Sequence, residues 1–346
     1  MTDLFIYLPF ALSLFAGTIF GLIAANTRFC LLGAISDIWL MQNKSRAVFW
    51  GITAMSALAG TSLLRWLDLL DVSQTTFLIT PVTLLPAIIG GSLFGIGMVL
   101  ATGCLVKNIL RIGSGCLKSV VVVILTALSA RFVFSGPLSA FRSWLYDTWP
   151  IFINSQVLEV PYLAIVAIIL LLAQIFFVWK KTIYPFSFWI KAVLLGSIVS
   201  MVWLMTSWLI MQAGQSDCSL MLLPDGRLIP LSLAFLRSVV NVLDWLLWSK
   251  DVFTFSLGIL MGTLAGSALY YAIKGRWVFS GFQNVYDLRN HLIGALLMGI
   301  GAALAGGCSI GQGLSGLSTG SVHALVTLCC MVLSASVILI YMDKKA

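Results

Sequence analysis

Long apolar runs separated by short polar breaks dominate this chain. Ten of the runs approach or reach the length of about 20 residues that a helix needs to cross the hydrocarbon core of a bilayer. They cover residues 4–25, 47–64, 84–103, 118–135, 161–179, 188–211, 228–248, 252–273, 291–306 and 321–342. The pattern predicts an all-α polytopic membrane protein, in which residues 1–346 form a single membrane domain.

The breaks between these runs predict the orientation of the helices, because Lys and Arg favour the cytoplasmic side of a membrane. This rule places the following residues inside: Lys44, Arg46, Lys180, Lys181, Lys344 and Lys345. Residues 136–160 and 213–227 carry few basic side chains and are expected outside. Two short amphipathic stretches, 30–42 and 105–116, are expected to be re-entrant pieces.

One segment occurs twice. Residues 89–104 read IGGSLFGIGMVLATGC and residues 293–308 read IGALLMGIGAALAGGC, with ten of sixteen positions identical at an offset of 204. Transporters are often built from two repeats, with the substrate near the midplane where helices are interrupted. We therefore expect two pseudo-symmetric halves, about 4–135 and 252–342, joined by helices at about 136–251.

Small residues also recur at helix-contact spacing, which lets helix backbones approach closely in lipid. The sets are Gly17/Gly21, Gly91/Gly95 and Gly258/Gly262/Gly266. We interpret all three as packing surfaces.

The composition supports a membrane protein and excludes several other classes. Charged residues make up 9 % of the chain, against about 25 % in soluble domains. The net charge of +8 is divided among short clusters between apolar runs, so it does not indicate nucleic-acid binding. No GxxxxGK[ST] motif is present, which argues against ATP hydrolysis.

The seven cysteines are an odd number, with no CxxC and no Cys/His spacing typical of zinc. We predict neither a disulfide framework nor a cofactor. Cys104 and Cys308 end the two copies of the repeat, and both lie in glycine-rich breaks. We interpret these duplicated Gly-Cys breaks as a permeation site rather than as two structural turns.

A broken helix that starts again presents free backbone N–H groups, which favour an anion. The first break adds basic side chains, and the second adds small and polar groups. The candidate substrate-path residues around them are Arg28, Cys30, Gly103, Cys104, Lys107, Asn108, Arg111, Gly307, Cys308, Ser309, Gly311, Gln312 and Gly313. Polarizable thiols suit a soft sulfur-bearing anion better than sulfate or phosphate. Lys118 is interpreted as an ordinary interfacial anchor.

Three motifs together resemble the YeeE/YedE family of sulfur-transport membrane proteins. They are NTRFCLLGA at 26–34, LFGIGMVLATGC at 93–104 and GGCSIGQG at 306–313. The resemblance implies a non-enzymatic, multi-pass protein of the bacterial inner membrane that takes up thiosulfate or a related sulfur compound. It also implies that Cys30, Cys104 and Cys308 pass the anion along by transient S–H hydrogen bonds. A small cytoplasmic sulfurtransferase of the TusA type is the partner that the family implies.

The chain departs from this family in the first break. Thiosulfate-transporting relatives tend to carry a carboxylate where this sequence has Ser114, and Lys107 is an added charge. The resemblance therefore leaves the exact substrate open.

Two alternatives remain at this level. The same cysteines could act covalently in an intramembrane redox or sulfur-transfer reaction. His291 and His323, the only histidines, could hold a haem, although both are more typical of interface or core positions. His323 aligns with Ser119 of the first repeat. Asp37 and Asp244 are candidates for proton coupling, and an interfacial position is the simpler interpretation of each.

Overall fold

The computed structural model describes residues 2–79, 82–147, 150–151, 184–213, 229–248, 254–277 and 279–345. The predicted run at 161–179, the Lys180-Lys181 pair and Cys218 lie outside these residues.

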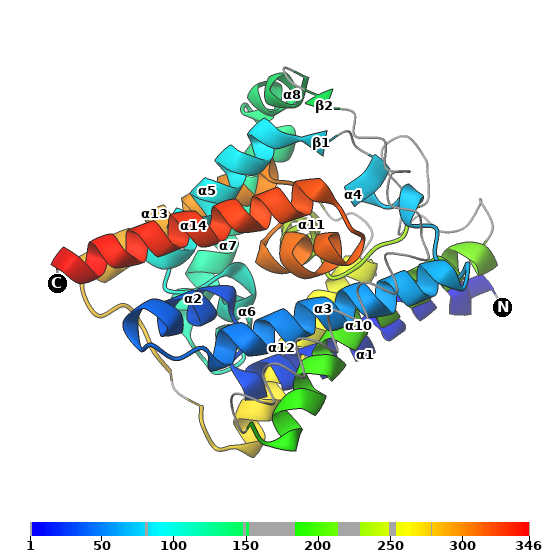
Figure 1. Ribbon diagram of the computed structural model, residues 1–346, viewed down its shortest axis with the longest axis horizontal. Helices are drawn as coiled ribbons and strands as arrows, with labels where there is room; N and C mark the ends of the chain where they lie inside the picture. The colour runs from blue at the N-terminus through cyan, green and yellow to red at the C-terminus, as the bar shows by residue number, and fades with distance from the viewer. Residues whose placement is uncertain are drawn as a thin grey trace.

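Helices make up most of the described chain (Figure 1). The longer helices are α1 (Thr2–Thr27), α3 (Ser45–Trp66), α5 (Leu84–Leu100), α7 (Leu117–Ser135), α10 (Phe186–Ala213), α12 (Phe255–Ile273), α13 (Val285–Leu304) and α14 (Val322–Lys345). The shorter elements are α2 (Leu31–Leu40), η1 (Val72–Gln74), α4 (Thr76–Ile79), α6 (Leu105–Ile112), α8 (Ser139–Asp147), α11 (Phe235–Trp248) and the π-helical η3 (Gly311–Gly316). Strands β1 (Val82–Thr83) and β2 (Pro150–Ile151) form one short antiparallel pair.

Seven stretches among the described residues are long and apolar enough to cross a membrane. This confirms the predicted all-α polytopic class. The two short stretches expected to be re-entrant are also short helices, α2 and α6.

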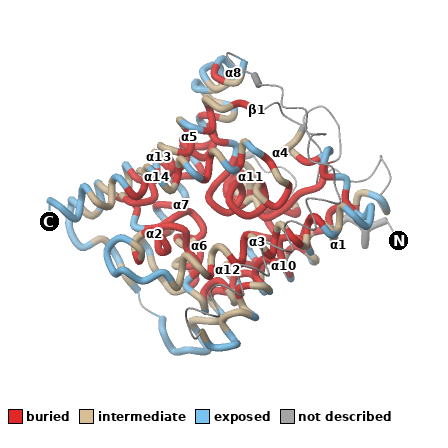
Figure 2. Tube along the Cα trace, viewed as in Figure 1, coloured by how far each residue is buried: buried red, intermediate tan, exposed pale blue. Residues whose placement is uncertain are grey.

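The long helices form two groups with short helices between them (Figure 1). In one group α1 packs along α12, and α3 packs along α10; in the other, α5 lies between α13 and α14, and α7 covers α13. Helices α2, α6 and α11 lie between the groups, where buried residues concentrate (Figure 2). The core of the protein therefore surrounds the short helices.

Within each group, helix backbones approach one another closely at glycine positions, as the glycine spacing predicts. A Cβ atom on Gly17 would lie 2.5 Å from the carbonyl oxygen of Ile259 on α12. A Cβ atom on Gly91 would lie 2.7 Å from the carbonyl oxygen of Thr327 on α14. Neither site has room for a side chain, so the packing interpretation of these glycines is confirmed.

Both copies of the repeated segment are broken helices with the same backbone feature. Helix α5 ends near Thr102, whose φ is +53°, and α13 ends near Gly306, whose φ is +72°. These two positions are 204 residues apart, the offset of the sequence repeat. Each turn reverses into a new helix start, at Leu105 and at Ser309. The wider division into two pseudo-symmetric halves stays a prediction.

The apolar run at 228–248 differs from its expected form. Only α11, which begins at Phe235, is helical, and residues 229–234 are irregular. Pro230 has no backbone N–H and disfavours a helical conformation in the residue before it. The run is therefore an irregular buried segment followed by a 14-residue helix, too short to span alone.

Candidate functional site

Each of three cysteines lies at the start of a short helix. Cys30 is the N-cap of α2, and its sulfur accepts a hydrogen bond from the backbone N–H of Gly33 at 3.5 Å. Cys104 is the N-cap of α6. Cys308 directly precedes the helix that begins at Ser309, and backbone N–H groups, among them those of Gly311 and of Leu236 on α11, approach its thiol. Three thiols thus lie at the positive ends of short helices.

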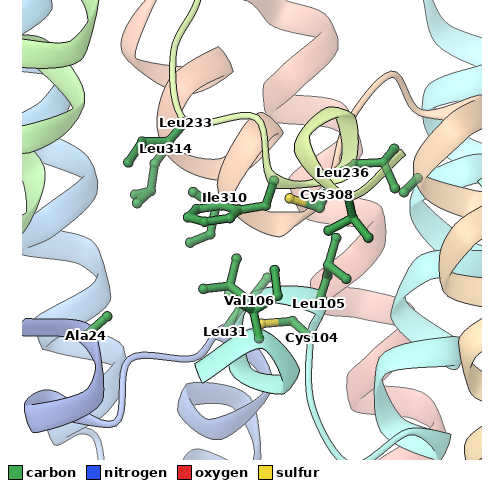
Figure 3. Close-up of a cluster of buried hydrophobic side chains, with 14 of the residues drawn as sticks. Ala24, Leu31, Cys104, Leu105, Val106, Leu233, Leu236, Cys308, Ile310 and Leu314 are labelled. Carbon is green, nitrogen blue, oxygen red and sulfur yellow. The ribbon is translucent and has the colours of Figure 1, made fainter. Parts of the chain in front are cut away.

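The three thiols are buried in the middle of the molecule. The sulfur atoms of Cys30 and Cys104 are 3.8 Å apart, although 74 residues separate them. Figure 3 shows Cys104 and Cys308 on opposite sides of a cluster of buried apolar side chains that includes Leu105 and Ile310. The buried side chains of Leu105, Val106 and Ile310 lie around and between Cys104 and Cys308, and we call these three side chains the apolar layer.

A cavity of about 270 Å³ opens beside Cys30. We call it the inner cavity, because Arg46, in its wall, belongs to the cluster predicted to be cytoplasmic. Four cationic side chains line it, those of Arg28, Arg46, Lys107 and Arg111. The phenol of Tyr271 also lies in its wall. Among the described residues, no carboxylate lines it. Its electrostatic potential therefore favours an anion.

Most of these cations have a defined contact. Arg46 pairs with Asp37 on α2 at 3.1 Å. Lys107 Nζ donates to the carbonyl oxygen of Thr102 at 3.0 Å, and Arg111 Nη1 donates to the Thr102 hydroxyl at 3.2 Å. Cations at the end of α5 complement the negative end of the helix dipole. They brace the break and keep positive charge next to Cys30.

A second cavity, of about 540 Å³, lies beside Cys308, and we call it the outer cavity. Side chains from several elements line it, including Arg142, Tyr146, Arg237, Gln312 and His323. Tyr146 donates its phenolic hydrogen to the carbonyl oxygen of Leu304 at 2.9 Å, and burial raises the pKa of this phenol. The phenol therefore stays a neutral donor that supports the end of α13.

Amide side chains brace both breaks at equivalent positions. Asn108 Nδ2 donates to the carbonyl oxygens of Gly103 and Cys104, each at 3.2 Å. Gln312, 204 residues later, donates to the carbonyl oxygen of Ala305 at 2.7 Å. These bonds satisfy backbone groups that the interrupted helices leave open.

The structure divides the predicted path residues among four places. Arg28, Cys30, Lys107 and Arg111 line the inner cavity, and Gly307, Cys308, Gly311 and Gln312 line the outer cavity. Gly103, Cys104, Asn108 and Ser309 are buried and line neither cavity. Gly313, next to Gln312 in η3, lines neither cavity and packs against Trp50 and Leu328, where a Cβ atom would collide with the indole ring.

Sequence reasoning did not assign several lining residues to the site. The positive-inside pattern explains Arg46 as a topological anchor only, and none of the three motifs contains Tyr271, Arg142 or Arg237. Arg237 carried a usable signal, since an ionisable residue inside an apolar run marks a functional position by default. The other three gave no local signal, because the packing of distant helices brings them to the cavities.

The remaining titratable candidates have partners in the structure. Asp244 pairs with Arg131 at 2.8 Å, and Lys118 pairs with Asp287 at 2.6 Å. His291 Nε2 lies 3.3 Å from the Thr102 hydroxyl. Among the described residues, no group of three or more His, Cys, Asp or Glu side chains could hold a metal ion.

In the part of the chain that the structure describes, seven stretches of membrane length, two broken helices and two cavities that meet buried thiols define a multi-pass membrane transport protein. The family model for sulphur transport matches residues 26–337, and the chain belongs to this family, the YeeE/YedE family that its motifs resemble. The thiosulfate transporter TsuA of Escherichia coli strain K12 is 24 % identical over 330 residues, which cover 87 % of this chain and 85 % of that protein. The thiosulfate transporter TsuA of Spirochaeta thermophila is 26 % identical over 320 residues, covering 88 % and 90 %. The similarity to transporters supports transport of a sulfur-containing anion across the bacterial inner membrane.

Proposed function

We propose that this protein takes up thiosulfate or a closely related anion through a path formed by Cys308, Cys104 and Cys30, in that order. The single observation that carries the proposal is the position of the thiols. Cys308 lines the outer cavity, Cys30 lines the inner cavity, and Cys104 lies 3.8 Å from Cys30 between them.

The helix starts at these thiols supply a suitable environment for an anion. Backbone N–H groups at a helix N-terminus attract negative charge without adding a fixed charge that would trap the substrate. A neutral thiol adds a weak S–H donor and a polarizable surface. We therefore propose that the thiols stay protonated, since thiolates would repel the anion.

Ser309 supplies a further donor between the two ends of the path. Its hydroxyl is fully buried, lies near the Cys104 thiol, and makes no well-formed hydrogen bond within the described part of the chain. A buried polar group without a partner costs about 1–3 kcal/mol. We propose that an oxygen atom of the passing anion accepts a hydrogen bond from this hydroxyl.

The apolar layer between Cys308 and Cys104 gives the path its barrier. Leu105, Val106 and Ile310 are at most 2 % exposed. A hydrated dianion cannot cross such a layer without a large desolvation cost. We propose that the conformation described here is closed, and that a shift of the broken helices brings Cys308 and Cys104 within reach of one anion.

The other predicted residues have supporting roles in this scheme. Arg28, Lys107 and Arg111 attract the anion on the inner side, and Asn108 and Gln312 brace the two breaks. Gly103, Gly307, Gly311 and Gly313 let the backbone turn and pack closely. The two-half organisation, 4–135 and 252–342 joined by 136–251, would place equivalent breaks on the two sides of the layer. A TusA-like sulfurtransferase would receive the anion at the inner cavity.

Uptake of radiolabelled thiosulfate into proteoliposomes tests the proposal. We expect Cys104→Ala and Cys308→Ala each to abolish uptake, and Cys329→Ala to have no effect. Cys329 is a matched control, because it is an exposed thiol on α14, away from both cavities. Wild-type uptake by a Cys104→Ala, Cys308→Ala double variant would exclude the thiol path.

The close Cys30–Cys104 pair also favours a second candidate, covalent sulfur transfer on the same residues. Intact-protein mass spectrometry during turnover separates the two candidates. A sulfur adduct on Cys104 or Cys308 that forms and decays with transport supports covalent transfer. Unmodified protein throughout turnover supports passage by hydrogen bonding.

A further inference from the structure

We propose that the outer cavity contains a separate binding site for a divalent tetrahedral oxoanion, centred on the guanidinium groups of Arg237 and Arg142. This inference rests on the proposed function and extends it. The site would hold the sulfonate oxygens of the substrate before its outer sulfur reaches Cys308. Because it recognises oxygen atoms, it would also accept sulfate, which the thiol path does not favour.

The backbone of α11 positions Arg237 next to the proposed path. It follows Leu236, whose N–H approaches the Cys308 thiol, in the first turn of α11. Both Arg237 and Cys308 line the outer cavity. An anion at the start of α11 would therefore lie near the guanidinium group and near the thiol.

Among the described residues that line the cavity, no carboxylate is free to pair with Arg237. The carboxylate of Asp244 also faces the cavity, but it is engaged by Arg131 at 2.8 Å. Arg237 makes no hydrogen bond or ion pair with any residue that the structure describes. A cation within an apolar membrane helix is costly, and such residues face a cavity, a partner charge or an anion.

Arg142 provides an independent second observation. Its guanidinium carbon lies 5.3 Å from the ring centroid of Phe134 and 5.0 Å from that of Tyr146, so two aromatic rings fix its position. Its Nε atom is buried and has no hydrogen-bond partner among the described residues. The two rings therefore hold a second guanidinium group at the wall of the outer cavity.

The chemistry of the site follows from these two groups. A guanidinium group is planar and always charged, and it binds oxoanions through two parallel hydrogen bonds. Such a fork recognises the oxygens of sulfate and of a sulfonate head equally well. Selection for a sulfur atom at the other end would then occur at the next step, at Cys308.

Equilibrium binding of radiolabelled sulfate to the purified full-length protein tests the site. We expect Arg237→Gln to weaken sulfate binding by about 10-fold to 100-fold, the loss of charge-assisted hydrogen bonds. Arg237→Lys keeps the charge without the fork and should give an intermediate affinity. Arg276→Gln is the matched control, because it removes an exposed arginine from the loop after α12.

Sulfate should also compete with thiosulfate for uptake, with an inhibition constant that rises in Arg237→Gln. Unchanged sulfate affinity in Arg237→Gln would overturn the site. If Arg237→Gln does not fold, sulfate binding to Arg237→Lys tests the site in its place. A sulfate affinity of Arg237→Lys equal to that of the wild type would also overturn the site. Sulfate binding that depends on Arg237 in a protein that does not transport thiosulfate would refute the proposed function alone. Cysteine-dependent transport with Arg237-independent sulfate binding would refute the site alone.

Discussion

The contact between α5 and α13 carries both Gly-Cys breaks, so a single methyl group there should affect both stability and uptake. In the structure Gly301 on α13 packs directly on the backbone of α5. A Cβ atom at this position would lie 2.5 Å from the backbone nitrogen of Phe94 and 2.6 Å from the carbonyl oxygen of Gly90. These neighbours are backbone atoms, which cannot rotate away.

The Gly301→Ala variant must therefore separate the two helices. Contacts between carbon and other heavy atoms are most favourable at about 3.5–4.0 Å, so the backbones must move apart by roughly 1 Å. Overpacking of this kind costs about 1–3 kcal/mol. The same shift alters the spacing between Cys104 and Cys308, which end these two helices, and should lower thiosulfate uptake.

Thermal unfolding in detergent and uptake in proteoliposomes measure the two effects. Gly281→Ala is the matched control, since Gly281 lies in a loop with no atom within 4 Å of an added Cβ. We expect the control to behave as the wild type. Equal stability and uptake in the two variants would refute the argument that this contact sets the geometry of the breaks.

Three other variants test the first break, the apolar layer and the inner cavity. Asn108→Ala should cost about 1–3 kcal/mol, because it removes the side-chain donor to the Gly103 carbonyl and the amide oxygen that accepts from the Ser119 hydroxyl; unchanged thermal stability would contradict the bracing role. Leu105→Ala should thin the apolar layer and raise the ratio of sulfate to thiosulfate uptake, and it should destabilise the fold by about 2–5 kcal/mol; an unchanged ratio would show that the layer is not the barrier. Arg28→Gln should raise the thiosulfate concentration for half-maximal transport from the inner side about 5-fold, from the loss of about 1 kcal/mol of charge attraction; the same concentration dependence as the wild type would remove Arg28 from the path.

The sequence determined the features that depend on local composition. Apolar runs of membrane length predicted the all-α polytopic class, because a chain in lipid must satisfy its backbone within helices. The duplicated Gly-Cys segment predicted the interruptions after α5 and α13, since glycine-rich polar stretches do not continue a membrane helix. The shortness of α2 and α6 followed from their polar boundaries in the same way.

Only the tertiary structure decided which residues meet. Cys30 and Cys104 are 74 residues apart, and their 3.8 Å contact depends on how α2 and α6 fit between the two helix groups. Arg237 belongs to a cavity because α11 starts late, after an irregular segment that the apolar pattern of 228–248 did not distinguish from helix. Lipid is as apolar as a leucine side chain, so hydrophobicity alone does not select the partner of a membrane helix. Close packing and hydrogen bonds make that choice, and they depend on residues far apart in the chain.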